Sequence, residues 1–320
     1  MFTRKGSIGL IIFYGLLMVL CWQTPAVAAS APPPTIDDIV GTYSVKDAEV
    51  WYDFPDGFRG RWMYNLTWRI TKISDTPPRV EVYIPEEDWD LRFTASYKNG
   101  FLVWSGGDVS DPTFSWASLG IALFSGKQGK VKFKADSGYA EYGTSVGDPY
   151  CEWDPHKGKM ISTNPGLTVG ATLASQGDEQ AAFAPGEETV PLGAASPPTI
   201  DSLLGTYSCT LTSTLYSLTA GTTEKKPKQS DTVTITKIDD QTLNMSTSGG
   251  DMYIHYGAGV LMIVNVDADT LDTDAGYGIL IAKGKPGKIS LKGKLLQNRN
   301  LETPDDEFEV TKVSCKQTSE

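Results

Sequence analysis

The chain has 320 residues, of which 40% are hydrophobic and 21% charged, and its formal net charge is −11. This negative charge keeps the protein in solution and opposes binding to phosphate backbones, so no nucleic-acid partner is expected.

The first 29 residues form a predicted signal peptide. Arg4 and Lys5 precede an apolar run over residues 8–21, and small residues follow at 26–29, where a signal peptidase would cut. The apolar run is shorter than the roughly 20 residues needed to span a bilayer. Leu20 stands where a lipoprotein needs a small residue before its cysteine. We therefore expect a secreted or periplasmic protein without a stable membrane anchor.

The rest of the chain is a tandem repeat. Pro-Pro-Thr-Ile-Asp followed by Gly-Thr-Tyr-Ser occurs at residues 33–44 and returns at 197–208. Ile-Thr-Lys-Ile at residues 70 and 235, and Gly-Lys-x-Gly-Lys at 126 and 284, keep the same order at a nearly constant offset. We therefore expect two copies of one domain, residues 30–158 and 197–320. Residues found in both copies are expected to specify the fold, and residues found in one copy are candidates for its own function.

Residues 159–196, between the two copies, form a predicted flexible linker. The segment is rich in Ala, Gly, Thr and Pro and has no sustained apolar period. A flexible chain of this length has a typical end-to-end distance on the order of 35 Å. We therefore expect the two domains to be loosely tethered.

Alternating apolar and polar residues predict an all-β fold. Residues 130–135, for example, carry lysines on one face and apolar groups on the other. Many short strands at this spacing favour a sandwich or a closed barrel, and closure removes exposed edges. We predict two antiparallel β-barrels of about eight strands each. In the first copy the expected strands are residues 41–52, 64–73, 79–84, 91–97, 101–105, 118–124, 130–135 and 139–153.

Each copy begins with the same short segment. Residues 35–40 predict a helical turn before Gly41-Thr42-Tyr43, and residues 199–204 precede Gly205-Thr206-Tyr207 in the same way. This entry resembles that of the lipocalin-like, or calycin, barrels, which carry Gly-x-Trp at the start of the first strand. Tyr replaces Trp in both copies, and neither the family's second motif nor its arginine on the last strand is found. The resemblance implies barrels that form a cup for a small apolar or amphipathic molecule.

The cysteines predict one disulfide. Cys209 opens the second repeat and Cys315 closes it, and the first and last strands of a closed barrel are neighbours, so the two can pair in an exported protein. Two free thiols are the alternative. In the first repeat we match Cys151 to Cys315, with Val45 in the place of Cys209. Cys151 is then an odd cysteine, either a half-buried relic or the site of an intermolecular disulfide.

Tryptophan distinguishes the two copies. Seven of the eight tryptophans fall in the first repeat and none in the second, so the fold does not require them. They either fill a bulkier core or stack on a ligand ring. Pro and Gly within residues 51–62 predict a loop at the barrel mouth. We predict that a small hydrophobic or aromatic ligand binds there through Trp51, Phe54, Phe58, Arg59, Arg61 and Trp62.

The case for an enzyme is thin. Residues 143–147 match the Gly-x-Ser-x-Gly motif around Ser145, but Asp148-Pro149 would break the helix that this motif needs. The chain has only two histidines, His156 and His255, as partners. Acidic residues at 86–90 offer paired carboxylates, although such loops are more often merely solvated. No catalytic residue is assigned.

A calcium ion is the one cofactor that the sequence suggests. Asp267, Asp269, Asp272 and Asp274 fall within eight residues, and oxygen clusters suit calcium. The spacing departs from the EF-hand loop, which leaves this site a weak expectation.

Together these features predict an exported, non-enzymatic protein that binds a small apolar or ring-bearing ligand in or at the mouth of its first barrel. The alternative is a structural or protein-interaction protein of the cell envelope, with barrels filled by their own side chains and an envelope protein as partner.

Overall fold

The computed structural model describes residues 32–318 apart from gaps at 49, 54–57, 62, 86–89, 109–114, 143–149, 167–196, 258, 266–274 and 300–306. The predicted signal peptide and most of the predicted linker lie outside the described residues. Pro33–Glu320 forms one compact unit. No helix in the described part of the chain is long and apolar enough to cross a membrane.

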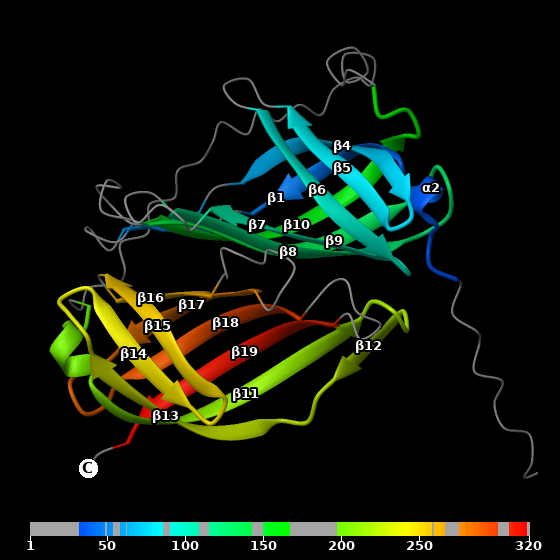
Figure 1. Ribbon diagram of the computed structural model, residues 1–320. Coiled ribbons are helices and arrows are strands. Elements are labelled where there is room, and N and C mark those ends of the chain that lie inside the picture. Colours follow the sequence, from blue (N-terminus) through cyan, green and yellow to red (C-terminus); the bar gives the residue numbers. More distant parts are fainter. Residues whose placement is uncertain are drawn as a thin grey trace, which may run out of the picture. The chain divides into compact units, whose positions relative to one another are not determined.

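The first domain is a closed antiparallel barrel with eight strand positions (Figure 1). Strand β10 pairs with β1 through its second half and with β2 through its first half, so β1 and β2 share one position and close the ring. The short β3 continues from β2 as a hairpin. The elements are α2 (Ile36–Ile39), β1 (Gly41–Asp47), β2 (Val50–Asp53), β3 (Phe58–Arg61), β4 (Tyr64–Asp75), β5 (Pro78–Pro85), β6 (Asp90–Lys98), β7 (Phe101–Asp108), β8 (Ser115–Ser125), β9 (Lys132–Tyr142) and β10 (Tyr150–Ser162).

The second domain repeats this architecture, as the sequence predicts. Its first strand, β11, pairs with its last strand, β19, along the length of both and closes the second barrel. The short β12 extends from β11 as a hairpin (Figure 1). The elements are η3 (Ile200–Leu203), β11 (Gly205–Ser217), β12 (Thr222–Lys225), β13 (Gln229–Lys237), β14 (Thr242–Thr247), β15 (Gly250–Gly257), β16 (Val260–Asn265), β17 (Ala275–Lys283), β18 (Ser290–Arg299) and β19 (Glu307–Gln317).

The tyrosine shared by both copies ties the helical turn to the barrel. The Tyr43 hydroxyl donates a hydrogen bond of 2.7 Å to the carbonyl of Ile39, and the Tyr207 hydroxyl donates one of 2.8 Å to the carbonyl of Leu203. Both rings are fully buried. A buried hydroxyl needs a partner, and the last carbonyls of a short helix lack one within the helix. The Gly-Thr-Tyr motif therefore fixes how the chain enters each barrel.

A second tyrosine holds the Pro-Pro segment in each copy. Tyr97 donates to the carbonyl of Pro34, and Tyr256 donates to the carbonyl of Pro198. These four residues stand at equivalent places in the two barrels, at the end covered by the helical turn. The expectation that shared residues specify the fold is confirmed at these positions.

The helical-turn end of the first barrel is filled with rings. Tyr43, Phe124 and Phe133 contact one another with centroid separations of 5.0–6.0 Å, and all three are buried. They belong to an interior cluster that also includes Trp68 and Met160. This packing closes one end of the barrel, so open space lies toward the other end.

The predicted disulfide between Cys209 and Cys315 is confirmed. The two cysteines lie directly opposite each other on β11 and β19. The corresponding pair in the first barrel is Val45 and Gly158, which face each other on β1 and β10. The match of Cys151 to Cys315 is therefore wrong, because it rested on sequence order and not on strand register.

Cys151 is free and fully buried. Burial raises the pKa of its thiol well above the ordinary value. A thiol so placed is neither half-buried nor accessible to a second molecule, which argues against the intermolecular disulfide.

Along several strands, the apolar residues that alternate with the interior ones form a second buried cluster. We call it the outer-face cluster, and both barrels contribute to it within the compact unit. On β7, Leu102 and Trp104 belong to the interior, whereas Phe101 and Val103 belong to this outer-face cluster. Residues of both barrels take part, and Tyr277 is among them. The Tyr277 hydroxyl lies 2.9 Å from the carbonyl of Tyr139 and 2.6 Å from that of Glu152. Strands of both barrels thus carry apolar residues on their outer faces as well as on their inner faces. The expectation of a flexible linker between the domains stays a prediction.

Three predicted boundaries differ from the structure. Strand β10 continues to Ser162, with Met160 buried, so residues 159–162 belong to the barrel and not to the linker. The single strand expected at 139–153 is instead the end of β9 and the start of β10. Much of the loop expected within residues 51–62 is the β2–β3 hairpin.

Candidate ligand-binding site

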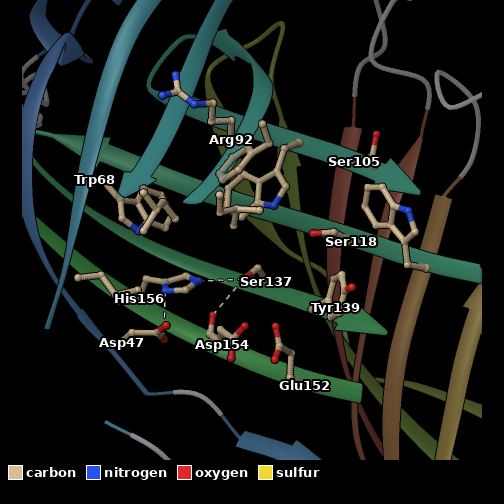
Figure 2. A pocket seen from close by; sticks show the side chains of 18 residues that line it. Asp47, Trp68, Arg92, Ser105, Ser118, Ser137, Tyr139, Glu152, Asp154 and His156 are labelled. Carbon is tan, nitrogen blue, oxygen red and sulfur yellow. Dashed lines mark hydrogen bonds and ion pairs between the residues drawn. The ribbon is translucent and has the colours of Figure 1, made fainter. Parts of the chain in front are cut away.

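The open end of the first barrel contains a pocket of about 400 Å³. Strands β1, β8, β9 and β10 supply its polar wall, and strands β4 to β7 supply an apolar wall (Figure 2). The polar wall consists of Asp47, Ser118, Ser137, Tyr139, Glu152, Asp154 and His156, and the apolar wall includes Leu66, Trp68, Ile84, Leu91, Phe93 and Trp104.

Three buried polar side chains form a chain along the polar wall. His156 Nδ1 lies 3.1 Å from Asp47 Oδ1, and His156 Nε2 lies 2.9 Å from Ser137 Oγ. The Ser137 hydroxyl is also 3.5 Å from the carbonyl of Asp154. Each of these four residues is only 6–7% exposed. Figure 2 shows them close together, with the Trp68 ring 5.1 Å from the His156 ring and Arg92 farther away.

The contact between Asp47 and His156 lacks hydrogen-bond geometry. Although the two atoms are close, neither Asp47 Oδ1 nor His156 Nδ1 makes a hydrogen bond. A buried carboxylate oxygen without a hydrogen bond is costly and is therefore uncommon in folded proteins. The polar wall thus holds an acceptor that a ligand could satisfy.

Two tryptophans, Trp68 and Trp104, belong to the apolar wall. Trp68 packs edge-on against Phe93 and Trp104, with centroid separations of 6.2 Å in each case, and Phe93 lies 5.2 Å from Trp104. Trp68 is 1% exposed, and its indole Nε1 makes no hydrogen bond. Trp116, on β8, adds another ring to the lining. The Trp68 ring also packs against Phe133 and His156, at centroid separations of 5.0 and 5.1 Å, so this wall is rigid and largely buried.

Arg92 is the arginine among the described lining residues, and its side chain contacts groups outside the pocket. Its guanidinium lies 3.8 Å from the centroid of the Tyr83 ring and 3.4 Å from Glu81. The side chain is 55% exposed. Its charge is thus directed toward solvent and toward Glu81, away from the buried carboxylates.

The second barrel has its own pocket, of about 810 Å³. Aliphatic residues line it together with the disulfide and polar groups near the mouth. Ser213 and Thr311 form a buried hydrogen bond of 2.7 Å within it. Its sole aromatic lining residue is Tyr277, among those that the structure describes. The two copies therefore share a hollow barrel but differ in what the hollow offers a ligand.

The predicted mouth site is only partly described. Trp51 lies on β2, and Phe58, Arg59 and Arg61 lie on β3, but their side chains fall outside the described part of the structure. Phe54 and Trp62 also lie outside it. The assignment of these six residues to a ligand site stays a prediction.

The described tryptophans divide between two roles. Trp68, Trp104 and Trp116 line the pocket, whereas Trp153 packs in the outer-face cluster. Sequence reasoning selected the tryptophan-rich copy but missed the polar wall of the pocket. The alternation of polar residues at 152, 154 and 156 on one strand is the signal that could have located it.

The polar wall contains an acid, a histidine and a serine next to one another, in the order found in a catalytic triad: Asp47, His156 and Ser137. A serine nucleophile also needs donors aimed at the developing oxyanion. The backbone of Ser137 and Gly138 pairs with β8 on one side and β10 on the other, so these amides belong to the sheet. Ser145, the serine of the Gly-x-Ser-x-Gly match, lies outside the described residues. We therefore treat the chain as a polar binding surface.

The candidate calcium site also lies outside the described residues, since Asp267, Asp269, Asp272 and Asp274 fall in the gap at 266–274. Among the residues that the structure does describe, no cluster of three or more His, Cys, Asp or Glu side chains could hold a metal. Calcium binding by the four aspartates stays a prediction.

No protein-family model matches the chain, and no curated protein matches it. Solved structures give only distant similarities. A protein of unknown function from the DUF3598 family of Nostoc punctiforme is 10% identical over 89% of this chain and 99% of its own, with a TM-score of 0.31. A provisionally named outer membrane protein of Bacteroides fragilis is 12% identical over 87% and 98%, with a TM-score of 0.21. A provisionally named AttH of Nitrosomonas europaea is 7% identical over 92% and 98%, with a TM-score of 0.20. At these scores none supports an argument about function.

Proposed function

We propose that this protein is an exported, non-enzymatic binder whose first, lipocalin-like barrel holds a small ring-bearing ligand. The observation that carries the proposal is the pocket with an aromatic wall facing a buried polar wall. Binding sites for small molecules are concave, mostly apolar and furnished with a few placed polar groups. The ring of the ligand would stack against Trp68 and Trp104, and its polar end would lie near His156.

Export is supported by two features. The sequence carries a predicted signal peptide, and the second barrel has a disulfide between Cys209 and Cys315. Disulfides form and persist mainly outside the reducing cytosol. We therefore place the binding event in the periplasm or outside the cell.

Native mass spectrometry of the full mature chain, purified gently from its source cells, tests the proposal. We expect a reproducible extra mass on the wild-type protein. Ser118→Phe should abolish this mass, because a ring added to the lining fills much of the pocket. Ser125→Phe, at the exposed end of the same strand, is the matched control and should retain it.

A bare mass on the wild-type protein, together with no ligand-dependent change in tryptophan fluorescence, would contradict ligand binding. That outcome would favour the alternative, a structural or protein-interaction role in the cell envelope. The same extra mass on Ser118→Phe would place the ligand elsewhere in the chain, including at the predicted mouth residues.

A further inference from the structure

The hollow of the second barrel is about twice as large as that of the first, about 810 Å³ against about 400 Å³. Smaller side chains at matching positions account for the difference. Trp68 pairs across its strands with Tyr43, and Val233 pairs in the same way with Tyr207, the matching tyrosine of the second copy. A valine thus lines the second pocket where an indole lines the first.

Two further ring positions are exchanged in the same way. Phe93 lies four residues before Tyr97, and Met252 lies four residues before Tyr256, the tyrosines that hold the two Pro-Pro segments. The next strand begins Phe-Leu-Val-Trp in the first copy and Val-Leu-Met-Ile in the second, so an isoleucine replaces a tryptophan. The exchanged lining residues are Trp68, Phe93 and Trp104 in the first barrel and Val233, Met252 and Ile263 in the second.

The deep part of the second pocket is aliphatic as a result. Tyr277, the aromatic residue among its described lining, belongs to the outer-face cluster and not to the interior cluster. A ring would therefore gain no stacking here. The lining of an empty space forfeits dispersion contacts, which a flexible chain of methylene groups can restore. The aliphatic lining, next to the disulfide, consists of Leu211, Val233, Met245, Met252, Ile263, Leu280, Leu295 and Val313.

The lining changes from apolar to polar along β19. The residues of this strand that face the pocket in alternation are Cys315, Val313, Thr311 and Glu309, and they span about 20 Å of strand. Thr311 marks the boundary, because its hydroxyl forms the buried hydrogen bond of 2.7 Å with Ser213 and also lies 3.2 Å from Glu309. A molecule that matches this lining is apolar at its inner end and forms hydrogen bonds at its outer end.

We propose that the second barrel is a second binding site, which holds a single-chain amphiphile with an unbranched acyl chain and a hydrogen-bonding head group. The chain would lie among the aliphatic residues with its end near the disulfide, and the head group would lie at the level of Thr311 and Gln297. This site is separate from the pocket of the first barrel. The two binding events can therefore be tested independently.

Isothermal titration of the full-length mature protein with the glycerol monoesters of hexanoic, octanoic and decanoic acid tests the proposal. These probes are uncharged and share one head group. We expect the affinity to rise about tenfold for each pair of methylene groups added. Val233→Trp with Met252→Phe, which copies two rings of the first barrel into the second, should weaken binding of the decanoic ester by about tenfold or more. Thr232→Trp with Tyr253→Phe, at exposed positions on the same strands, is the matched control and should bind as the wild type does. Ser118→Phe, in the first pocket, should also bind the ester normally.

The outcomes separate this inference from the proposed function. Equal affinities for the three esters, or no binding of any of them, would overturn the acyl-chain site and leave the first barrel to its own test. Binding that is lost in Ser118→Phe but kept in Val233→Trp with Met252→Phe would place the chain in the first barrel and overturn the inference.

Photolabelling of the wild-type protein provides a second measurement if the double variant fails to fold. The decanoic ester would carry a diazirine at the end of its chain. We expect it to label peptides from residues 205–317, which contain the lining of the second pocket. Labelling confined to residues 33–162 would overturn the inference.

Discussion

Val45 and Gly158 occupy the positions that Cys209 and Cys315 occupy in the second copy. A Cβ built on Gly158 would lie 2.0 Å from Cε1 of the Phe133 ring, so only glycine leaves room for this ring. The second barrel has Leu291 opposite Cys315, where the first barrel has Phe133 opposite Gly158. The two copies thus reach the same strand contact by a covalent bond in one and by an aromatic ring in the other.

This exchange can be tested by transferring the disulfide. We expect Val45→Cys with Gly158→Cys and Phe133→Leu to form a second disulfide, because the paired strand positions match and the smaller side chain leaves space. The same two cysteines without Phe133→Leu should remain reduced. Alkylation of free thiols followed by mass spectrometry distinguishes the two variants, with free Cys151 as the constant background. Equal oxidation of both would show that Phe133 is not the obstacle.

At the scale of the element, the tyrosines that anchor each entry turn predict sensitivity to alkali. Burial raises the pKa values of Tyr43 and Tyr207 well above the ordinary value of 10.0. A tyrosine with a raised folded-state pKa contributes its full stability below the unfolded pKa, and this contribution is lost as the pH rises above about 10. Thermal unfolding followed by circular dichroism should therefore show a melting temperature that falls from about pH 10 upward.

Tyr43→Phe is the control for this alkaline loss. The variant should be less stable at neutral pH by about 1 kcal/mol, because the Ile39 carbonyl loses its donor. Its stability should also fall less steeply with pH than that of the wild type, since one buried hydroxyl no longer titrates. If the stability of the two proteins falls equally steeply with pH, ionisation of Tyr43 is not a cause of the alkaline loss.

The disulfide between β11 and β19 gives a second prediction at this scale. Cross-linking residues 106 apart in sequence should contribute about 4–5 kcal/mol to the second barrel through the entropy of the unfolded chain. Cys209→Ala with Cys315→Ala should lose this amount in denaturant unfolding and show no further effect of reductant. Cys151→Ala should respond to reductant as the wild type does. Loss of reductant sensitivity in Cys151→Ala would mean that this thiol takes part in the linkage.

Strand positions were predictable from the sequence, and the site was only partly so. Alternation located β4 to β8 within a few residues, because each places one residue in two inside the barrel. The polar wall brings together Asp47 from β1, Ser137 from β9 and His156 from β10, which are far apart in the chain. Their meeting depends on strand register, which a single sequence does not determine. The outer-face cluster was also missed, because its apolar residues gave the same signal as ordinary strand formers.

At the scale of the whole molecule, the outer-face cluster predicts that the barrels stay together without a covalent link. A protease site introduced between residues 167 and 196 should allow cleavage of the chain, and the two halves should then elute as one species in size exclusion. Ile279→Glu should separate the halves, because it buries a charge in the cluster. Tyr253→Glu, on a residue that is 69% exposed, should not. Separate elution of the unmodified halves would contradict the packing.

The ring closed by Cys209 and Cys315 also affects how the protein withstands proteolysis. The covalent loop encloses almost all of the second barrel, including its turns. A single peptide bond cut by a protease within that loop leaves both pieces attached, so the nicked barrel can keep its shape. The described part of the first barrel has no such tie, and Cys151 is its free cysteine. A cut there can release a fragment, so proteolysis would inactivate the copy with the aromatic pocket before the second copy.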